Sequence, residues 1–235
     1  MNLSNKVYLQ LLIKSGVHYF QKNQPNIYYN KNNNIEESKI NFSLDFINNI
    51  DELINSINSF DSPLKKTAKN LVLFDGNINS DLMIIGEAPG KDEDNLGKPF
   101  VGRAGQLLNK MLSAINLKRQ DVYITNVLPW RPPNNRTPTD SEILEFLPFL
   151  QKHIEIIKPK VILLLGATAS KAILSTPLTL SKLRGKFYNY KSLNLGYTIK
   201  TLVSYHPAFL LRSPNYKKEA WNDLQLLQKK ITDEN

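Results

Sequence analysis

Short apolar runs alternate with helical segments along most of this chain, and that alternation limits the fold more than any other feature. The expected strands cover residues 82–85, 122–125, 161–165 and 198–204. The helices that alternate with them are expected over residues 104–115, 141–157, 167–174 and 215–231. This pattern is typical of a parallel sheet with helices packed on both faces. We therefore expect a three-layer α/β/α protein.

The N-terminal part of the chain follows a different pattern. Residues 1–20 are predicted to form an amphipathic helix, and a second helix is predicted over residues 44–60, where apolar residues recur every three or four positions. Between them, residues 21–39 are rich in Asn, Lys and Gln, which bury too little apolar surface to order a segment. We divide the chain into an N-terminal helix with its linker, 1–40, and one main domain, 41–235. A packing helix, a partner-docking arm and a poorly ordered tail all fit residues 1–40.

The charge and the lack of cysteine restrict the partners and cofactors of the protein. Lys and Arg number 30 against 21 Asp and Glu, a formal net charge of +9, which fits either a polyanionic partner or a solvated basic surface. The chain contains no cysteine, so disulfides, thiol nucleophiles and thiolate-bound metals are excluded. No apolar run reaches the length of a membrane span, and we recognise no signal peptide. We expect a cytoplasmic protein without a membrane segment.

Glycine and polar residues follow the expected strands at their carboxyl ends, where open α/β sheets bind ligands. The first such segment begins Gly86-Glu87-Ala88-Pro89-Gly90, continues through Glu93-Asp94 and reaches Phe100 before the next helix. Its glycines and prolines make a stiff loop that can bring backbone amides close to a ligand. The alternative is a surface turn with solvated acids and an aromatic side chain that belongs to the core.

Two further strands end in residues suited to binding. One ends in Thr125-Asn126, whose amide carries a donor and an acceptor and can read a ligand or merely cap a turn. The last strand leads into His206-Pro207, where the histidine can donate a hydrogen bond to a ligand or be structural. Leu210, Leu211 and Arg212 follow, and an apolar pair beside a cation fits insertion into a stack of bases as well as packing in a core.

Together these segments resemble the family 4 branch of the uracil-DNA glycosylase superfamily, from residue 59 to about residue 227. The motifs that carry the resemblance are Gly86-Glu87-Ala88-Pro89-Gly90, Glu93-Asp94, Gly97, Pro99-Phe100-Val101-Gly102, Thr125-Asn126-Val127, Arg131-Pro132-Pro133, Asn135-Arg136-Thr137-Pro138 and His206-Pro207. The ordered set is specific, although no single motif is. It implies a central parallel sheet of about four strands with a uracil pocket at its carboxyl edge. It also implies an enzyme that flips uracil out of DNA and hydrolyses its N-glycosidic bond, leaving an abasic site in base-excision repair.

The resemblance also implies which residues contact the base. Phe100 would stack on the flipped uracil, Asn126 would read its N3 and O4 edge, and His206 would bind O2. Backbone groups at Gly86 and Ala88 would line the same pocket. Cytosine reverses the donor and acceptor pattern at the two atoms that Asn126 reads, so a site built for uracil leaves buried polar groups unpaired with cytosine.

The motifs contain three candidates for the catalytic carboxylate. By the resemblance, Glu87 is the first candidate to position or activate water, Glu93 and Asp94 are weaker candidates, and His206 would stabilise the leaving base. The better-known branch of the superfamily has an aspartate where Ala88 stands, so its direct activation of water does not transfer to this chain. The residues expected to contact DNA are Arg131, Arg136, Leu210, Leu211 and Arg212.

Typical members of this family hold a four-iron cluster on four cysteines, and this chain departs from them. The positions that align with those cysteines are Ser59, Ser62, Trp130 and Phe146. Large aromatic side chains can fill the volume of the cluster by packing. We therefore predict an enzyme without a cofactor. His18 and His153 lie on helical patterns and are expected to be structural, so no metal site is predicted either.

Two other classes of function remain as alternatives. A catalytically silent DNA-binding or accessory protein would keep the fold, the positive charge and the apolar wedge, but it would not need Glu87 or Asn126. A DNA polymerase subunit is a label sometimes attached to this family, yet the chain is far too short for a polymerase and lacks a paired-aspartate metal site. We prefer the enzyme, acting as a monomer on uracil-containing DNA.

Overall fold

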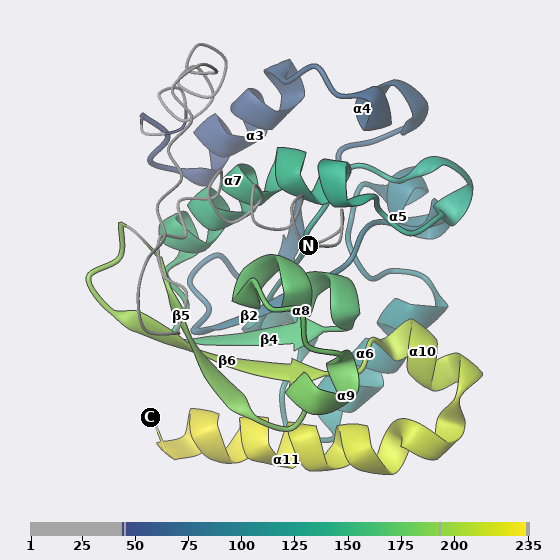
Figure 1. Ribbon diagram of the computed structural model, residues 1–235, viewed down its shortest axis with the longest axis vertical. Coiled ribbons are helices and arrows are strands. Elements are labelled where there is room, and N and C mark those ends of the chain that lie inside the picture. Colours follow the sequence, from purple (N-terminus) through teal and green to yellow (C-terminus); the bar gives the residue numbers. More distant parts are fainter. Residues whose placement is uncertain (1–43, 45, 193, 234–235) are drawn as a thin grey trace, which may run out of the picture.

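The computed structural model of the protein describes residues 44, 46–192 and 194–233 (Figure 1). The helix expected over residues 1–20 and the linker up to residue 40 lie outside these residues. No helix of the described segments is long and apolar enough to cross a membrane.

A six-stranded sheet forms the middle layer, with its strands in the order β1-β3-β2-β4-β6-β5. The strands are β1 (Phe74–Gly76), β2 (Leu82–Gly86), β3 (Tyr123–Asn126), β4 (Val161–Leu165), β5 (Phe187–Lys191) and β6 (Thr198–Ser204). Neighbours among β3, β2, β4 and β6 are parallel, which confirms the expected four-stranded parallel core. β1 and β5 add antiparallel edges that were not expected. These two strands lack a fully buried apolar run, so the sequence pattern that reveals a central strand is missing there.

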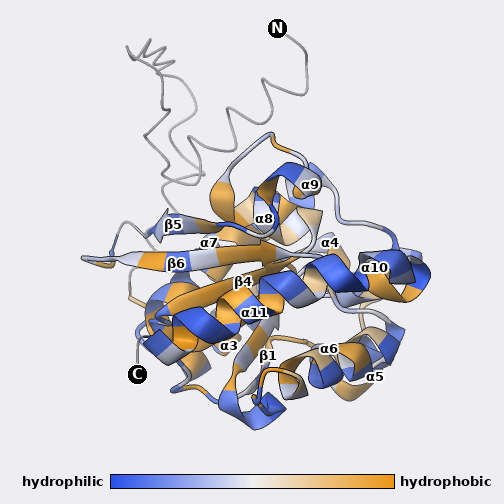
Figure 2. Cartoon of the chain, turned by 90° about the horizontal axis from the view of Figure 1, so that it is seen from below, coloured by the Kyte–Doolittle hydropathy of each residue, from blue (hydrophilic) through white to orange (hydrophobic). Residues whose placement is uncertain are grey.

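Helices cover both faces of the sheet. In the described chain they are α3 (Ile50–Ser59), α4 (Pro63–Thr67), α5 (Lys91–Leu96), α6 (Arg103–Ser113), α7 (Asp140–Ile157), α8 (Ala167–Leu174), α9 (Leu180–Leu183), α10 (Pro207–Arg212) and α11 (Lys217–Asp233). Three short 3-10 helices cover Arg119–Asp121, Pro133–Asn135 and Pro214–Tyr216. In Figure 2 the hydrophobic strand β4 lies between helices that carry both hydrophobic and hydrophilic residues, as a helix with one buried face does.

The two faces of the sheet build two separate cores, because successive residues of a strand point to opposite sides. Met83 and Ile85 of β2 join a core with residues of α3, α7 and α8. Leu82 and Ile84, which alternate with them, join the core formed with α6 and α11. The expected three-layer α/β/α architecture is confirmed.

Two helical boundaries differ from the expectation. The helix predicted over 44–60 is interrupted: α3 begins after Asn49, which has an extended backbone and accepts a hydrogen bond from the amide of Glu52 at 2.9 Å. The loop predicted after β2 contains the short helix α5, which ends at Gly97 with a left-handed φ of 68°. Local capping therefore decides where these helices begin and end.

The order of the strands places the functional loops together. The sheet grows outward from β2, whose neighbours are β3 on one side and β4 on the other. Loops that leave the carboxyl ends of neighbouring parallel strands on either side of such a reversal open a crevice, and ligands bind there in α/β proteins. Figure 1 shows the carboxyl ends of β4 and β6 pointing toward the side where α6 and α10 lie.

Candidate active site

Gly86 and Asn126 lie side by side at the carboxyl ends of β2 and β3, since they are partners in the parallel register. A Cβ atom on Gly86 would lie 2.4 Å from Oδ1 of Asn126 and 2.4 Å from Cζ of Phe100. Both side chains therefore approach the backbone of Gly86 more closely than any residue with a Cβ would permit. The glycine makes room for an amide and an aromatic ring to meet at the edge of the sheet.

The backbone of Phe100 is held in the left-handed region at φ 53°, a costly conformation for a bulky residue. Nη1 of Arg119 donates to its carbonyl at 3.0 Å. Glu93 Oε1 accepts hydrogen bonds from the amides of the next two residues at 2.9 Å each. A Cβ on Gly105 would lie 1.8 Å from the same carbonyl, so the helix α6 also packs against this turn. These contacts fix the direction of the Phe100 ring, which is 4% exposed.

The side-chain amide of Asn126 is available for a ligand. Asn126 is 6% exposed. Its amide has no hydrogen-bond partner among the residues that the structure describes. An amide that no other residue occupies can pair with a ligand that supplies both a donor and an acceptor.

His206 completes the cluster around Phe100. The two rings are stacked, with centroids 5.5 Å apart and an angle of 30° between their planes. His206 is the N-cap of α10, and its Nδ1 accepts a hydrogen bond from the amide of Ala208 at 3.1 Å. An accepting Nδ1 leaves the proton of the neutral ring on Nε2. Burial, assisted by the charge of Arg212, lowers the pKa of His206 to about 4, so the ring is a neutral Nε2–H donor near pH 7.

We expect acidification to destabilise the protein between about pH 6.5 and about pH 4.5. Burial lowers the pKa of His153 to about 3 and that of His206 to about 4, so both rings stay neutral in the folded protein. In the unfolded chain the same rings take up protons near pH 6.5, and the unfolded state therefore binds more protons throughout this window. The free energy of unfolding, measured with urea at about pH 7, 5.5 and 4.5, should fall with pH. A constant value would contradict two buried neutral histidines.

Glu87 directly follows Gly86, and its carboxylate is held by the first turn of α8. Thr168, in that turn, donates a hydrogen bond from Oγ1 to Oε2 of Glu87. Gly166, the N-cap of the same helix, lies close to His206, because a Cβ on Gly166 would lie 3.1 Å from Cβ of that histidine. Our reasoning from sequence did not single out Thr168. Its position, two residues past the glycine that follows a buried strand, is the signal by which it could have been found.

The other two carboxylates considered for water activation hold the loop together. Glu93 accepts hydrogen bonds from three backbone amides at 2.9–3.1 Å. Asp94 is 4% exposed, and its Oδ1 accepts from the amides of Lys69 and Asn70 at 2.8 and 3.1 Å. The structure therefore leaves Glu87 beside Gly86, held by Thr168, and engages Glu93 and Asp94 in the architecture of the surrounding loop.

The expected apolar wedge requires a correction. Leu210 is 1% exposed and packs in the core formed with α6 and α11, so it cannot enter a stack of bases. Consecutive residues of a helix point about 100° apart, and the docking of α10 on α6 turns Leu210 inward. Leu211 is half-buried and Arg212 is exposed. Within the described chain Arg212 forms no ion pair, which leaves it able to meet an anionic partner.

Arg131 and Arg136 are engaged by other residues of the protein. The guanidinium of Arg136 donates two hydrogen bonds to the carboxylate of Glu142, at 2.8 and 2.5 Å, and this interaction is the main cause that lowers the pKa of Glu142 to about 2. Arg131 donates to Oδ1 of Asn135 at 2.6 Å and lies 3.7 Å from the carboxylate of Asp94. These contacts stabilise the segment between β3 and α7, and the structure does not bring either arginine to the cluster around Phe100.

The four positions that align with cluster-binding cysteines do not fit an iron–sulfur cluster. Ser59 is exposed, whereas Ser62 is fully buried and donates to Oε2 of Glu145 at 3.2 Å. Trp130 and Phe146 are buried, and neither ring offers a ligand atom of the thiolate kind that such clusters use. Phe146 packs against Phe60 with ring centroids 5.9 Å apart, so packed aromatics occupy this region. In the described residues no group of three or more His, Cys, Asp or Glu side chains is placed to hold a metal ion.

Comparison with known proteins shows the family to which this chain belongs. Residues 73–225 match the family model described as the uracil DNA glycosylase superfamily. A type-4 uracil-DNA glycosylase of Archaeoglobus fulgidus is 43% identical over 166 residues, which cover 69% of this chain and 82% of the relative. Type-4 uracil-DNA glycosylases of Pyrobaculum aerophilum and Saccharolobus solfataricus are 42% and 41% identical, over 70% and 72% of this chain and 85% and 80% of their own. The chain therefore belongs to the uracil-DNA glycosylase superfamily and, within it, to the type-4 family.

Proposed function

We propose that the protein excises uracil from DNA by hydrolysing the N-glycosidic bond, as a monofunctional glycosylase of base-excision repair. The observation that carries this proposal is the meeting of the Asn126 amide and the Phe100 ring over Gly86. His206 stacks beside them at 5.5 Å from Phe100. Type-4 relatives that are 41–43% identical support the proposal, because their names state this activity.

The proposed pocket reads uracil by its hydrogen-bonding edge. Oδ1 of Asn126 accepts from N3–H of the base, and Nδ2 donates to O4. Cytosine presents an acceptor at N3 and an amino donor at C4. The acceptor Oδ1 would then face an acceptor, and the donor Nδ2 would face a donor. The Phe100 ring stacks on the base, and the missing side chain of Gly86 lets that ring and the Asn126 amide meet at the edge of the sheet where the base binds.

The proposed chemistry divides the charge of the transition state between two residues. The C1′–N1 bond breaks with its electrons moving to the base, and Nε2–H of His206 donates to O2, where negative charge develops. The carboxylate of Glu87 stabilises the positive sugar and accepts a proton from the water that attacks C1′. The base then takes a proton from solvent, so the net reaction is hydrolysis to uracil and an abasic site.

Incubation with a labelled oligonucleotide that contains one uracil, followed by alkali, tests the proposal, because alkali cleaves DNA at abasic sites. We expect cleavage at the uracil position and none at the same position in an oligonucleotide that carries cytosine. Binding of the oligonucleotide without cleavage would instead favour a catalytically silent DNA-binding protein that keeps the fold.

Thr168→Val should lower kcat about tenfold and leave KM nearly unchanged. Valine keeps the shape of threonine but removes the hydroxyl that orients the Glu87 carboxylate, and a hydrogen bond to a charged group is worth about that factor. Steady-state kinetics with the uracil oligonucleotide measure the change, and Thr168→Ser should restore most of it. Thr201→Val is the matched control, since Thr201 is a fully buried threonine on β6 whose hydroxyl bonds to the backbone of Ile199. Equal losses in both variants would refute a positioning role for Thr168.

We also propose that the enzyme works without an iron–sulfur cluster. Buried aromatic side chains at Trp130 and Phe146 support this, because the family resemblance implies cluster-binding cysteines at these two positions. Metal analysis of the purified, active protein should find no stoichiometric iron, and its visible spectrum should lack the broad absorbance of such a cluster. Iron in a fixed ratio to the protein would disprove the proposal.

The proposal extends to the oligomeric state and location of the enzyme. We propose that it acts as a monomer, because one chain supplies every residue of the proposed pocket, and we propose a cytoplasmic location. Light scattering of the protein with an uncleavable uracil-analogue oligonucleotide should give the mass of one chain per DNA strand.

A further inference from the structure

Three aromatic rings gather next to the proposed pocket. Tyr205 and Phe209 are stacked, with centroids 5.1 Å apart and planes at 25°. Tyr216 lies 5.2 Å from Tyr205 and 5.1 Å from Phe209, tilted against both. Tyr205 immediately precedes His206, and the amide of Phe209 donates to the carbonyl of His206 at 2.9 Å. The aromatic cluster of Tyr205, Phe209 and Tyr216 is therefore tied to the same turn as the pocket histidine.

The inner ring of this aromatic cluster is firmly anchored. Tyr205 is 6% exposed, and its hydroxyl donates to Oε2 of Glu219 at 2.9 Å. The guanidinium of Arg184 lies 5.3 Å from the centroid of the Tyr205 ring and pairs with Glu219 at 3.0 Å. It also donates to Asp223, so one guanidinium joins two acidic side chains beneath the aromatic cluster. The base of the cluster is thus rigid.

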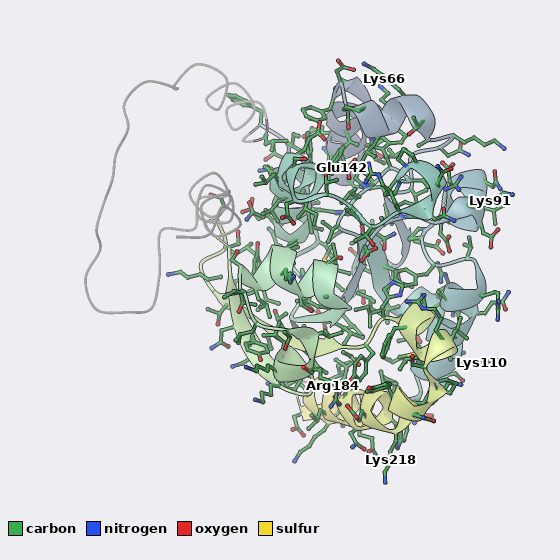
Figure 3. The ribbon with its side chains drawn as sticks, turned by 45° about the vertical axis from the view of Figure 1, so that its right-hand side comes forward. Lys66, Lys91, Lys110, Glu142, Arg184 and Lys218 are labelled. Carbon is green, nitrogen blue, oxygen red and sulfur yellow. The ribbon has the colours of Figure 1, made fainter. Side chains whose placement is uncertain are left out.

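The outer rings of the aromatic cluster face solvent among cations. Tyr216 is 40% exposed and Phe209 is half-buried. Arg212, Lys217 and Lys218 are exposed, and within the described chain none of the three forms an ion pair. In Figure 3 Lys218 extends from α11 away from the body of the protein. Unpaired cations beside exposed aromatic faces are the combination by which proteins bind single-stranded nucleic acid, with bases stacked on rings and phosphates near cations.

We propose that Phe209 and Tyr216 form a stacking platform for a nucleotide next to the extruded uracil, and that Arg212 and Lys217 bind the adjacent phosphates. The inference rests on the proposed function, since it adds a second base contact to the same DNA strand. It also supplies a contact that the buried Leu210 does not make, because Tyr216 is 40% exposed and Phe209 is only half-buried. The platform accepts any base, since every base has a face that can stack.

A structural role for the same rings is the competing explanation, in which they only close the junction between α10 and α11. The two explanations differ in one respect. A structural ring stabilises the enzyme equally for every substrate, whereas a platform contributes only when the substrate carries a base to stack on it. The test therefore varies the substrate and the protein together.

The experiment compares the wild-type protein with Tyr216→Leu on single-stranded oligonucleotides with one uracil, in which a tetrahydrofuran abasic unit replaces one neighbouring base at a time. At one neighbouring position we expect the abasic unit to lower kcat/KM of the wild-type enzyme about tenfold. Tyr216→Leu should show a loss of about the same size on the complete oligonucleotide and no further loss with that abasic unit. Tyr216→Phe, which keeps the ring, should keep the dependence on the neighbouring base.

Tyr197→Leu is the matched control, because Tyr197 is 46% exposed and lies just before the amino end of β6, whereas His206 follows its carboxyl end. A Tyr216→Leu loss that is the same on every oligonucleotide, or a wild-type enzyme indifferent to every abasic unit, would overturn the platform. If the wild-type protein excises no uracil at all, the proposed function fails instead. Fluorescence anisotropy with the same oligonucleotides then still shows whether Tyr216 and a neighbouring base are coupled in binding.

Discussion

Asn126→Asp is expected to lower kcat/KM for uracil excision by at least about 100-fold. The substitution replaces the amide donor that faces O4 of uracil by a carboxylate oxygen, so an attraction becomes a repulsion between two acceptors. Asn126 is 6% exposed, and a negative charge there adds to the repulsion. Single-turnover excision of a labelled uracil oligonucleotide measures the effect. Because the aspartate no longer opposes the amino group of cytosine, the preference for uracil over cytosine should narrow as well.

Asn189→Asp is the matched control for this substitution. Asn189 is exposed on the edge strand β5 and accepts a hydrogen bond from Nζ of Lys200 at 2.9 Å, which an aspartate at that position retains. It should excise uracil as the wild-type enzyme does. If Asn126→Asp also excised uracil at the wild-type rate, Asn126 would not be the residue that reads the base.

Glu87→Gln is expected to lower kcat by about 10²- to 10⁴-fold with little change in KM. Glutamine keeps the oxygen that accepts from Thr168, but it can neither take a proton from water nor stabilise a positive sugar. Single-turnover kinetics at saturating enzyme separate this effect from binding. In the Glu87→Gln background, Thr168→Val should cause no further loss, since the threonine acts through the carboxylate.

Glu93→Gln distinguishes the two neighbouring carboxylates. Glu93 holds three backbone amides of the Phe100 loop, so its replacement should lower the melting temperature while the folded fraction keeps most of its kcat. The opposite result, with Glu93→Gln inactive and Glu87→Gln active at unchanged stability, would assign the water-activating role to Glu93.

Much of the fold follows from local patterns in the sequence. The strands β2 and β4 are continuous apolar runs, each with a glycine at its carboxyl end. The helix α8 has the bounds that its pattern predicts. The edge strands were not predicted, because β1 has three residues and β5 is largely accessible, so neither carries a buried run. Sheet edges depend on pairing with a distant strand, and sequence periodicity does not record such pairing.

The residues of the candidate site were also predicted only in part. Gly86, Asn126 and His206 were found because each lies at the end of a strand or within two residues of it, and the carboxyl ends of parallel strands meet at one edge of the sheet. Leu210 was assigned to the wedge although it is buried, because a Leu-Leu pair has no periodicity that says which member faces the core. The packing of α10 against α6 determines that Leu210 is the leucine that faces the core.

The sequence by itself determined the layered α/β architecture, the family and the residues at the strand ends, because these depend on local hydrophobic periodicity and on motifs of a few residues. Tertiary structure alone decided which carboxylates, arginines and leucines are available to a substrate. Glu87 receives its hydrogen bond from a threonine 81 positions away, whereas Arg136 is occupied by Glu142. The partner of a side chain is set by the groups that the packed fold brings within hydrogen-bond distance. No local stretch of the sequence determines that proximity.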